Sequence, residues 1–219
     1  MEPAGVLKNS VWAVHLFALL IHVCVGFKAD AEPVKVTVYL ETLCPDSMIF
    51  VKHQLAPAWE NLREIMHVDF NAYGFVLETP LSEGYEFSCQ HGADECKGNM
   101  IIECARKYAD NLDAFVDFDV CFMSSSYPPN EGEICADNVG VAWSPIDICS
   151  KSVEGQQLLH ESGVRQNSLV PVPNYMPWII INDVFSQEYL DEAQSDLIGL
   201  VCRVYEGTLP PICQSSSHF

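Results

Sequence analysis

Apolar and polar positions along the first ordered part of the chain predict a strand, a helix and a second strand. Residues 34–40 and 68–73 have the apolar or alternating pattern of strands, and Gly74 ends the second one. Between them, residues 45–62 place apolar side chains at helical spacing on one face: Met48, Val51, Leu55, Trp59 and Leu62. Because proline lacks the amide hydrogen that a helix interior uses, we expect Pro57 to kink this helix. Consecutive strand, helix and strand predict a parallel pair in one sheet.

The rest of the pattern predicts a mostly helical middle and a late return to the sheet. Residues 75–100 have the composition of a loop, and residues 113–130 show no clear period. Three further helices are expected at residues 99–112, 149–162 and 187–205, a short buried strand at 178–181, and a hairpin turn at Asn182-Asp183 leading to Val184-Phe185. This order predicts an α/β, thioredoxin-like fold. The expected domain spans residues 32–213 with a helical insertion at about 75–170, and residues 214–219 form a flexible tail.

Charge and the N-terminal leader indicate the compartment. The chain of 219 residues has a formal net charge of −19, which argues against binding to nucleic acid or to anionic membranes. Residues 11–27 are almost wholly apolar and are followed by small residues, as in a secretory signal peptide. We therefore expect a signal peptide at residues 1–31, cleaved after Gly26 or Ala31, and no membrane attachment after cleavage. The alternative is an uncleaved membrane anchor.

The cysteine count singles out one thiol. Ten cysteines in a chain that enters the secretory pathway predict disulfides, and removal of Cys24 with the leader leaves nine. An odd number leaves one thiol unpaired, or paired with a second chain in a disulfide-linked dimer. If the other cysteines form four bridges, Cys44 is the one left over; those eight are Cys89, Cys96, Cys104, Cys121, Cys135, Cys149, Cys202 and Cys213. The sequence does not fix their pairing, although we expect Cys202 to pair with Cys213 and to tie the last helix to its tail.

Cys44 lies between the first strand and the first helix, where thiol-disulfide enzymes place their nucleophile. Only a thiolate attacks a disulfide, and a helix N-terminus stabilises a thiolate, whereas the nearby carboxylates of Glu41 and Asp46 oppose its negative charge. Those enzymes have a second cysteine three residues later, where this chain has Ser47. A serine hydroxyl cannot release a mixed disulfide, so an external small thiol would have to do so. We also expect a cis peptide bond before Pro177, which would place backbone groups beside Cys44.

A second motif is more specific. The segment Cys89-Gln90-His91-Gly92-Ala93-Asp94-Glu95-Cys96-Lys97-Gly98-Asn99, with Cys104 behind it, matches the pattern C-Q-H-G-x-x-E-C-x-x-N with a trailing cysteine. Through this signature the chain resembles the gamma-interferon-inducible lysosomal thiol reductase (GILT) family from about residue 34 to residue 213. The resemblance implies a thioredoxin-like lumenal oxidoreductase that reduces protein disulfides at acid pH. It also implies that Cys44 is the nucleophile, and that Ser47 occupies the position of the second catalytic cysteine.

Several interpretations of these residues stay open. The signature residues Cys89, His91, Cys96 and Cys104 have ligand types that suit zinc, but an oxidising lumen favours disulfides, so we expect no metal and no bound cofactor. We expect Gln90, His91 and Asn99 to be structural, with proton donation by His91 as an alternative. The chain is either a single-cysteine thiol-disulfide oxidoreductase acting on disulfide-containing proteins, a module that captures clients through Cys44, or an inactive lumenal protein. The expected location is a secreted or lysosomal lumen. The chain contains no Asn-x-Ser/Thr acceptor, which members of the family need for delivery to lysosomes through mannose tags, so secretion is the alternative to lysosomal delivery.

Overall fold

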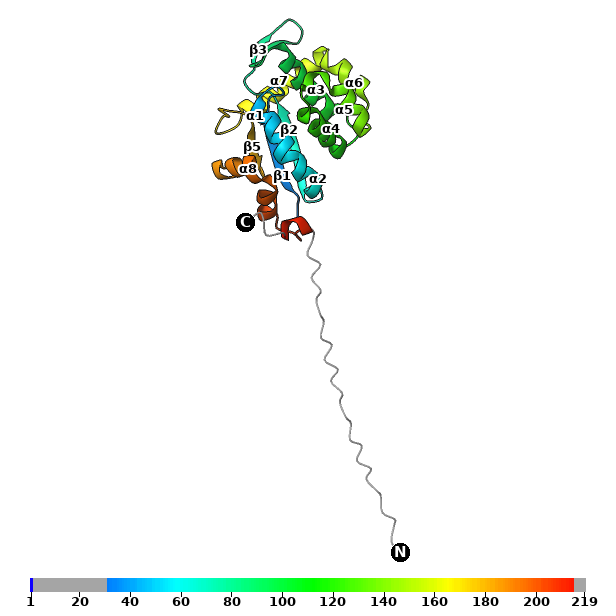
Figure 1. Cartoon of the computed structure of the whole chain (residues 1–219), viewed down its shortest axis with the longest axis vertical. Helices are drawn as coiled ribbons and strands as arrows, with labels where there is room; N and C mark the ends of the chain where they lie inside the picture. The colour runs from blue at the N-terminus through cyan, green and yellow to red at the C-terminus, as the bar shows by residue number, and fades with distance from the viewer. Residues whose placement is uncertain (2–30, 215–219) are drawn as a thin grey trace.

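A three-stranded sheet forms the centre of the molecule in a computed structural model that describes Met1 and residues 31–214 (Figure 1). The strand order is β2-β1-β5, in which β1 (Val34–Leu40) pairs in parallel with β2 (Met66–Ala72) and antiparallel with β5 (Trp178–Ile181). The register aligns Val36 with Val68 and with Ile181. The predicted strand-helix-strand start and its parallel pairing are confirmed.

The predicted first helix is present and is interrupted ahead of its proline. It consists of α1 (Pro45–Phe50), a π-helical segment η1 (Val51–Leu55) and α2 (Ala56–Leu62). In a π-helix the backbone amide donates to the carbonyl five residues earlier instead of four, and here the Ala56 amide donates to the Val51 carbonyl. A wider turn accommodates Pro57, which has no amide hydrogen to donate. The expected irregularity is therefore a bulge in the turn before the proline.

Helices occupy most of the chain between β2 and β5. The remaining elements are β3 (Leu77–Pro80), β4 (Tyr85–Ser88), α3 (Ala93–Tyr108), α4 (Leu112–Ser124), the 3-10 helix η2 (Pro128–Asn130), α5 (Gly132–Val139), α6 (Trp143–Ser150), α7 (Val153–Asn167), α8 (Gln187–Val204) and the 3-10 helix η3 (Pro211–Gln214). Figure 1 shows α3 to α6 gathered at one side of the sheet, with the β3–β4 ribbon at one end. An edge-to-face contact between Phe70 of β2 and Phe115 of α4, with ring centroids 6.1 Å apart, joins the sheet to these helices. One continuous apolar core results.

Two local predictions were wrong. Residues 75–100 are not loop throughout, because β3 and β4 form a hairpin and α3 begins at Ala93. The expected helix at 149–162 is two helices, since α6 ends at Ser150 and the Ser152 side chain caps the start of α7. The expected hairpin turn at Asn182 and Asp183 is present: both residues have positive φ angles, and Val184 makes an isolated antiparallel bridge to Ile181.

Four disulfides stabilise the part of the chain that the structure covers. They join Cys89 to Cys96, Cys104 to Cys149, Cys121 to Cys135, and Cys202 to Cys213. The last is the expected pairing of α8 with its tail. Three of the four potential zinc ligands in the signature, Cys89, Cys96 and Cys104, are held in disulfides and so are not available to a metal in this structure. Cys44 is the free cysteine among the described residues.

The predicted signal peptide and tail lie almost entirely outside the described residues. Residues 2–30 and 215–219 are not described, so the expected cleavage after Gly26 or Ala31 stays a prediction. Among residues 31–214, no helix has both the length and the apolar character that crossing a bilayer requires.

Candidate functional site

Cys44 lies where β1 gives way to α1 and is the residue that begins the helix. Its carbonyl accepts the first helical hydrogen bond, from the Met48 amide at 3.0 Å, while its own amide donates to the Glu41 carbonyl. The thiol is half-buried, and its sulfur lies 3.8 Å from the carbonyl oxygen of Met176. The peptide bond between Met176 and Pro177 is cis. The structure therefore brings together the helix N-terminus, the free thiol and the loop before β5.

Ser47 lies one helical turn after Cys44 and faces the interior. It is fully buried, and its hydroxyl oxygen has no hydrogen-bond partner among the described residues. A buried hydroxyl without a partner is destabilising, because folding strips it of water without replacing the lost hydrogen bond. The cavity around this position therefore suits a weakly polar side chain better than a hydroxyl.

The signature segment holds the loop that precedes Cys44. Asn99 of α3 is fully buried, and its Oδ1 accepts hydrogen bonds from the Thr42 amide at 3.0 Å and from the Thr42 hydroxyl at 2.9 Å. The Asn99 amide nitrogen donates to the Tyr73 carbonyl after β2, so one side chain joins both strand ends. Gly98 permits this close approach, since a Cβ there would lie 2.4 Å from Thr42 Oγ1. The position of Cys44 thus depends on α3.

Two buried carboxylates and one imidazole complete this support. Glu95 accepts hydrogen bonds from the Leu43 amide and from the amide and ring Nδ1 of His91, the latter at 2.5 Å. The His91 Nδ1 also lies 3.7 Å from Glu41 Oε2, an oxygen with no hydrogen-bond partner in the described chain. Burial raises the pKa of Glu41, and the Glu95 carboxylate raises it further. The hydrogen bond from the Phe75 amide and the nearby His91 lower this pKa, but they do not cancel the rise. Glu41 therefore holds its proton to a higher pH than an exposed glutamate.

Sequence reasoning found some of these residues and missed others. Cys44, Ser47 and Pro177 belong to one region, and His91 and Asn99 of the signature contact the adjoining loop. Gln90 is exposed and its side chain makes no hydrogen bond among the described residues, and Cys89, Cys96 and Cys104 are in disulfides. The contacts of Thr42 were missed, because nothing local to this threonine shows that it meets a residue 57 positions away.

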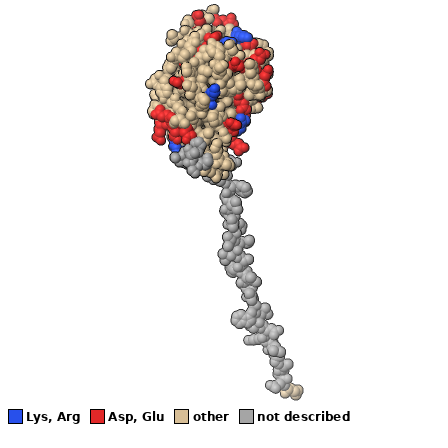
Figure 2. Space-filling model, in the orientation of Figure 1, with Lys and Arg blue, Asp and Glu red and all other residues tan. Residues whose placement is uncertain are grey.

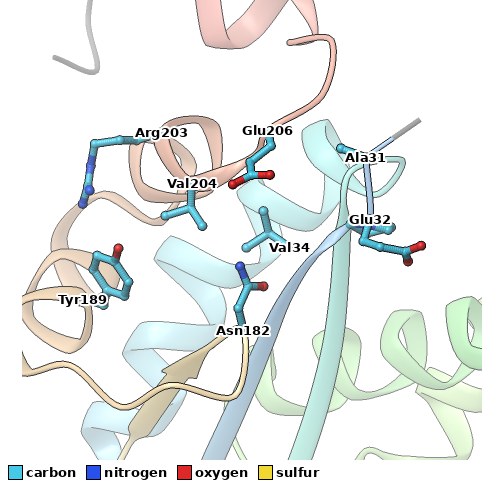
Figure 3. Close-up of a pocket in the computed structure, with 9 residues that line it drawn as sticks. Ala31, Glu32, Val34, Asn182, Tyr189, Arg203, Val204 and Glu206 are labelled. Atoms are coloured by element: carbon cyan, nitrogen blue, oxygen red, sulfur yellow. The ribbon is translucent and has the colours of Figure 1, made fainter. Parts of the chain in front are cut away.

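Carboxyl-bearing side chains, with far fewer basic ones, are scattered over the surface in Figure 2. A hollow of about 550 Å³ lies at the start of β1 between Glu32, Tyr189 and Glu206, as Figure 3 shows, at the opposite end of that strand from Cys44. A smaller apolar hollow begins at Pro45, the residue after Cys44, and is lined by Met48 among others. The hollow at the start of β1 is therefore not at the cysteine.

Comparison with known proteins gives consistent results. The family model described as gamma interferon inducible lysosomal thiol reductase (GILT) matches residues 35–139. The gamma-interferon-inducible lysosomal thiol reductase of Carassius auratus is 35% identical over 191 residues, which cover 85% of this chain and 74% of that protein. The protein of the same name from Mus musculus is 32% identical and covers 84% of this chain and 73% of its own length.

A solved structure supports the fold. The crystal structure of Chlamydia trachomatis DsbA superposes with a TM-score of 0.53 at 10% identity, covering 78% of this chain and 86% of that one. At this identity the likeness concerns the fold alone, and it shows a thioredoxin-like architecture of the DsbA type. The predicted fold class is confirmed.

Proposed function

Because the chain belongs to the gamma-interferon-inducible lysosomal thiol reductase family, we propose that it is a lumenal thiol-disulfide oxidoreductase in which Cys44 alone forms the covalent intermediate. The observation that carries this proposal is a free, half-buried thiol at the N-terminus of α1, in a chain whose other described cysteines are all paired. Helix N-termini stabilise thiolates, and only a thiolate attacks a disulfide.

The proposed reaction begins when the Cys44 thiolate attacks one sulfur of a disulfide in a client protein. The Cys44–client disulfide forms, the client disulfide breaks, and its second sulfur leaves as a thiolate that takes a proton from solvent. An external small thiol then attacks the Cys44 sulfur and releases the client as a dithiol. A second molecule of that thiol removes the first as its disulfide and restores Cys44. In sum, one client disulfide is reduced and two small thiols are oxidised.

Ser47 is the reason for the external thiol in this scheme. The resemblance places Ser47 at the second catalytic cysteine of the family, and its buried, unpartnered hydroxyl supports the view that the site is built for sulfur. A thiol is a much weaker hydrogen-bonding group than a hydroxyl and behaves as a small apolar group when buried. The same serine favours a second candidate function, in which the mixed disulfide persists and the protein holds its clients.

Acidification changes the charge of the loop that precedes Cys44. Because the pKa of Glu41 is raised, this buried carboxyl is neutralised at a higher pH than an exposed one, and the Glu41 carbonyl accepts a hydrogen bond from the Cys44 amide. A lysosomal or secreted lumen is part of the proposal because of the family, and a disulfide-linked dimer would have to form through Cys44 among the described cysteines.

The test is reduction of insulin at acid pH, with and without an added small thiol. We expect turnover that requires the thiol and disappears in Cys44→Ala. In Ser47→Cys the client should be released in a single turnover without added thiol, because the new thiol resolves the mixed disulfide, while repeated turnover still requires the small thiol to reduce the enzyme. A stable client adduct on Cys44 that the thiol does not release would establish the capture function instead. Absence of any adduct that depends on Cys44 would reject both functions.

A further inference from the structure

An apolar groove begins at the residue after Cys44. Pro45, Met48 and Ile49 of α1 form one wall, and Met123 with the serines that follow it at the end of α4 forms the other. The hollow has a volume of about 360 Å³, and Lys52 and His53, further along the same helical segment, also line it. A client chain bonded to Cys44 would have the residues next to its cysteine directly over this groove.

The apolar side chains that α1 contributes to the groove are available for contact, whereas Met123 of α4 is fully buried. Ile49 is 57% exposed, although it belongs to a well-formed helix whose opposite face is in the core. Met48 is only partly buried, and methionine adapts its shape to different partners because its side chain is unbranched and flexible. A protein that reduces many clients needs a surface of this kind, since the sequences around client cysteines differ.

Lys52 gives the groove a charge preference. The described residues include nine lysines and arginines; seven of them form ion pairs, and Lys52 and Lys97 do not. Lys52 also lines a second hollow of about 500 Å³, which continues along the same helix past Trp59 to Arg63. On a chain of net charge −19, an unpaired ammonium at the junction of two hollows attracts a carboxylate from a partner.

We propose that this groove binds the segment of the client that flanks the disulfide, and that it selects apolar residues followed by an acidic one. The proposal rests on the function proposed for Cys44 and adds the class of substrate. Lys52 follows Cys44 by eight positions, about 12 Å along a helix at about 1.5 Å per residue. An extended peptide covers that distance in about three to four residues. The preferred acidic residue is therefore the third or fourth from the client cysteine.

Two matched peptides test the charge preference. Each has one cysteine activated as a disulfide with thionitrobenzoate, apolar flanking residues, and either Glu or Lys at the third and fourth positions from the cysteine. Attack by Cys44 forms the protein–peptide disulfide and releases thionitrobenzoate as a coloured thiolate, whose rate of appearance is measured. We expect the wild-type protein to react about fivefold faster with the Glu peptide, the upper range for one exposed ion pair. Lys52→Glu should reverse this preference.

Matched variants separate the groove from general effects. Lys97→Glu makes the same change of charge at the other unpaired lysine and should keep the wild-type preference. Ile49→Ser should slow both peptides severalfold, whereas Ile134→Ser, at a residue that is also 57% exposed, should not. Equal preferences in Lys52→Glu and Lys97→Glu, or equal rates in the two serine variants, would overturn the proposal.

A non-covalent measurement keeps the groove testable if Cys44 proves unreactive. The same peptides with serine in place of cysteine, labelled with a fluorophore, are titrated with Cys44→Ala protein and followed by fluorescence anisotropy. Tighter binding of the Glu peptide that Lys52→Glu abolishes would support the groove even without chemistry at Cys44. Reaction at Cys44 with no preference between the peptides would reject the groove and leave the proposed function intact. A gel-filtration profile showing that Ile49→Ser converts a dimer to a monomer would assign the groove to a second copy of this chain instead.

Discussion

Replacement of Asn99 by alanine tests whether the signature segment supports the loop before Cys44. The alanine removes the acceptor for the Thr42 amide and the donor to the Tyr73 carbonyl, both in the interior. The Thr42 hydroxyl keeps an alternative acceptor in the Glu95 carbonyl, at 3.1 Å. Each of the two buried backbone groups left without a partner costs about 1–3 kcal/mol, so we expect a loss of about 2–6 kcal/mol in the free energy of unfolding.

Thermal unfolding and thiol alkylation measure the two consequences. For a domain of this size about 1 kcal/mol corresponds to a fall of about 2–4 °C in Tm, so Asn99→Ala should unfold about 4–24 °C below the wild type. The rate at which iodoacetamide modifies Cys44 in the folded protein should also change, because the loop that positions the thiol loses its anchor.

Asn61→Ala is the matched control for this prediction. Asn61 is exposed, and its side chain donates a hydrogen bond to the Pro57 carbonyl in its own helix, so its replacement should cost less than about 0.5 kcal/mol. If Asn99→Ala cost no more than Asn61→Ala, or left the alkylation of Cys44 unchanged, the role assigned to α3 would be refuted.

Three other variants test the energetics of the fold. Burial raises the pKa of Asp119 well above its usual value, and the attraction of Arg106 opposes this only in part. The native state therefore keeps a proton that the unfolded chain releases above about pH 4, so the wild type should lose stability as the pH rises. Asp119→Asn has no such proton, and its Tm should fall less than that of the wild type between about pH 5 and about pH 8. Burial would also raise the pKa of Asp69, but Arg165 and Arg106 hold it below its usual value, so these ion pairs persist down to acid pH. Asp69→Asn should cost about 1–3 kcal/mol in urea unfolding above about pH 4 and less below it. Cys202→Ser opens a disulfide with a sequence separation of 11 and should cost about 3 kcal/mol by the same measurement.

The elements around the sheet were predictable because their side-chain patterns are local. Residues 34–40 are buried almost without exception, and the four residues of β5 are all buried, so a run of apolar residues identifies both strands. The apolar face at residues 45–62 and the long pattern of α8 identify helices in the same way. In these segments a residue is buried or exposed according to its place in the repeat of the strand or helix, so the order of apolar and polar residues identifies the element.

The ribbon and the helix boundaries in the middle of the chain were not predictable on this basis. All four residues of β3 are exposed, so no apolar period marks the strand, and it is held by pairing with β4. The start of α3 lies within the signature, where Cys89 and Cys96 form a disulfide and Glu95 is buried to bind the loop before Cys44. Such residues are chosen for contacts with distant segments, which leave no local signal.

The candidate site divides in the same way. A cysteine before a helix and an odd cysteine count identified Cys44 from the sequence, and the signature indicated that residues 89–104 matter. The sequence did not show that His91, Glu95 and Asn99 act on residues 41–43, because these contacts span fifty positions or more. Lys52 was also not predictable as a binding residue, since its lack of an ion pair is known only from the folded chain.

The most direct test of the account is to locate the covalent intermediate. The folded protein is incubated at acid pH with a disulfide-containing client, quenched with an alkylating agent, and mapped by mass spectrometry without reduction. We predict a client adduct on Cys44, with Cys89–Cys96, Cys104–Cys149, Cys121–Cys135 and Cys202–Cys213 intact. The adduct should disappear on addition of a small thiol. A client bonded to any other cysteine, or a Cys44 that is recovered only in its alkylated form, would contradict the central claim.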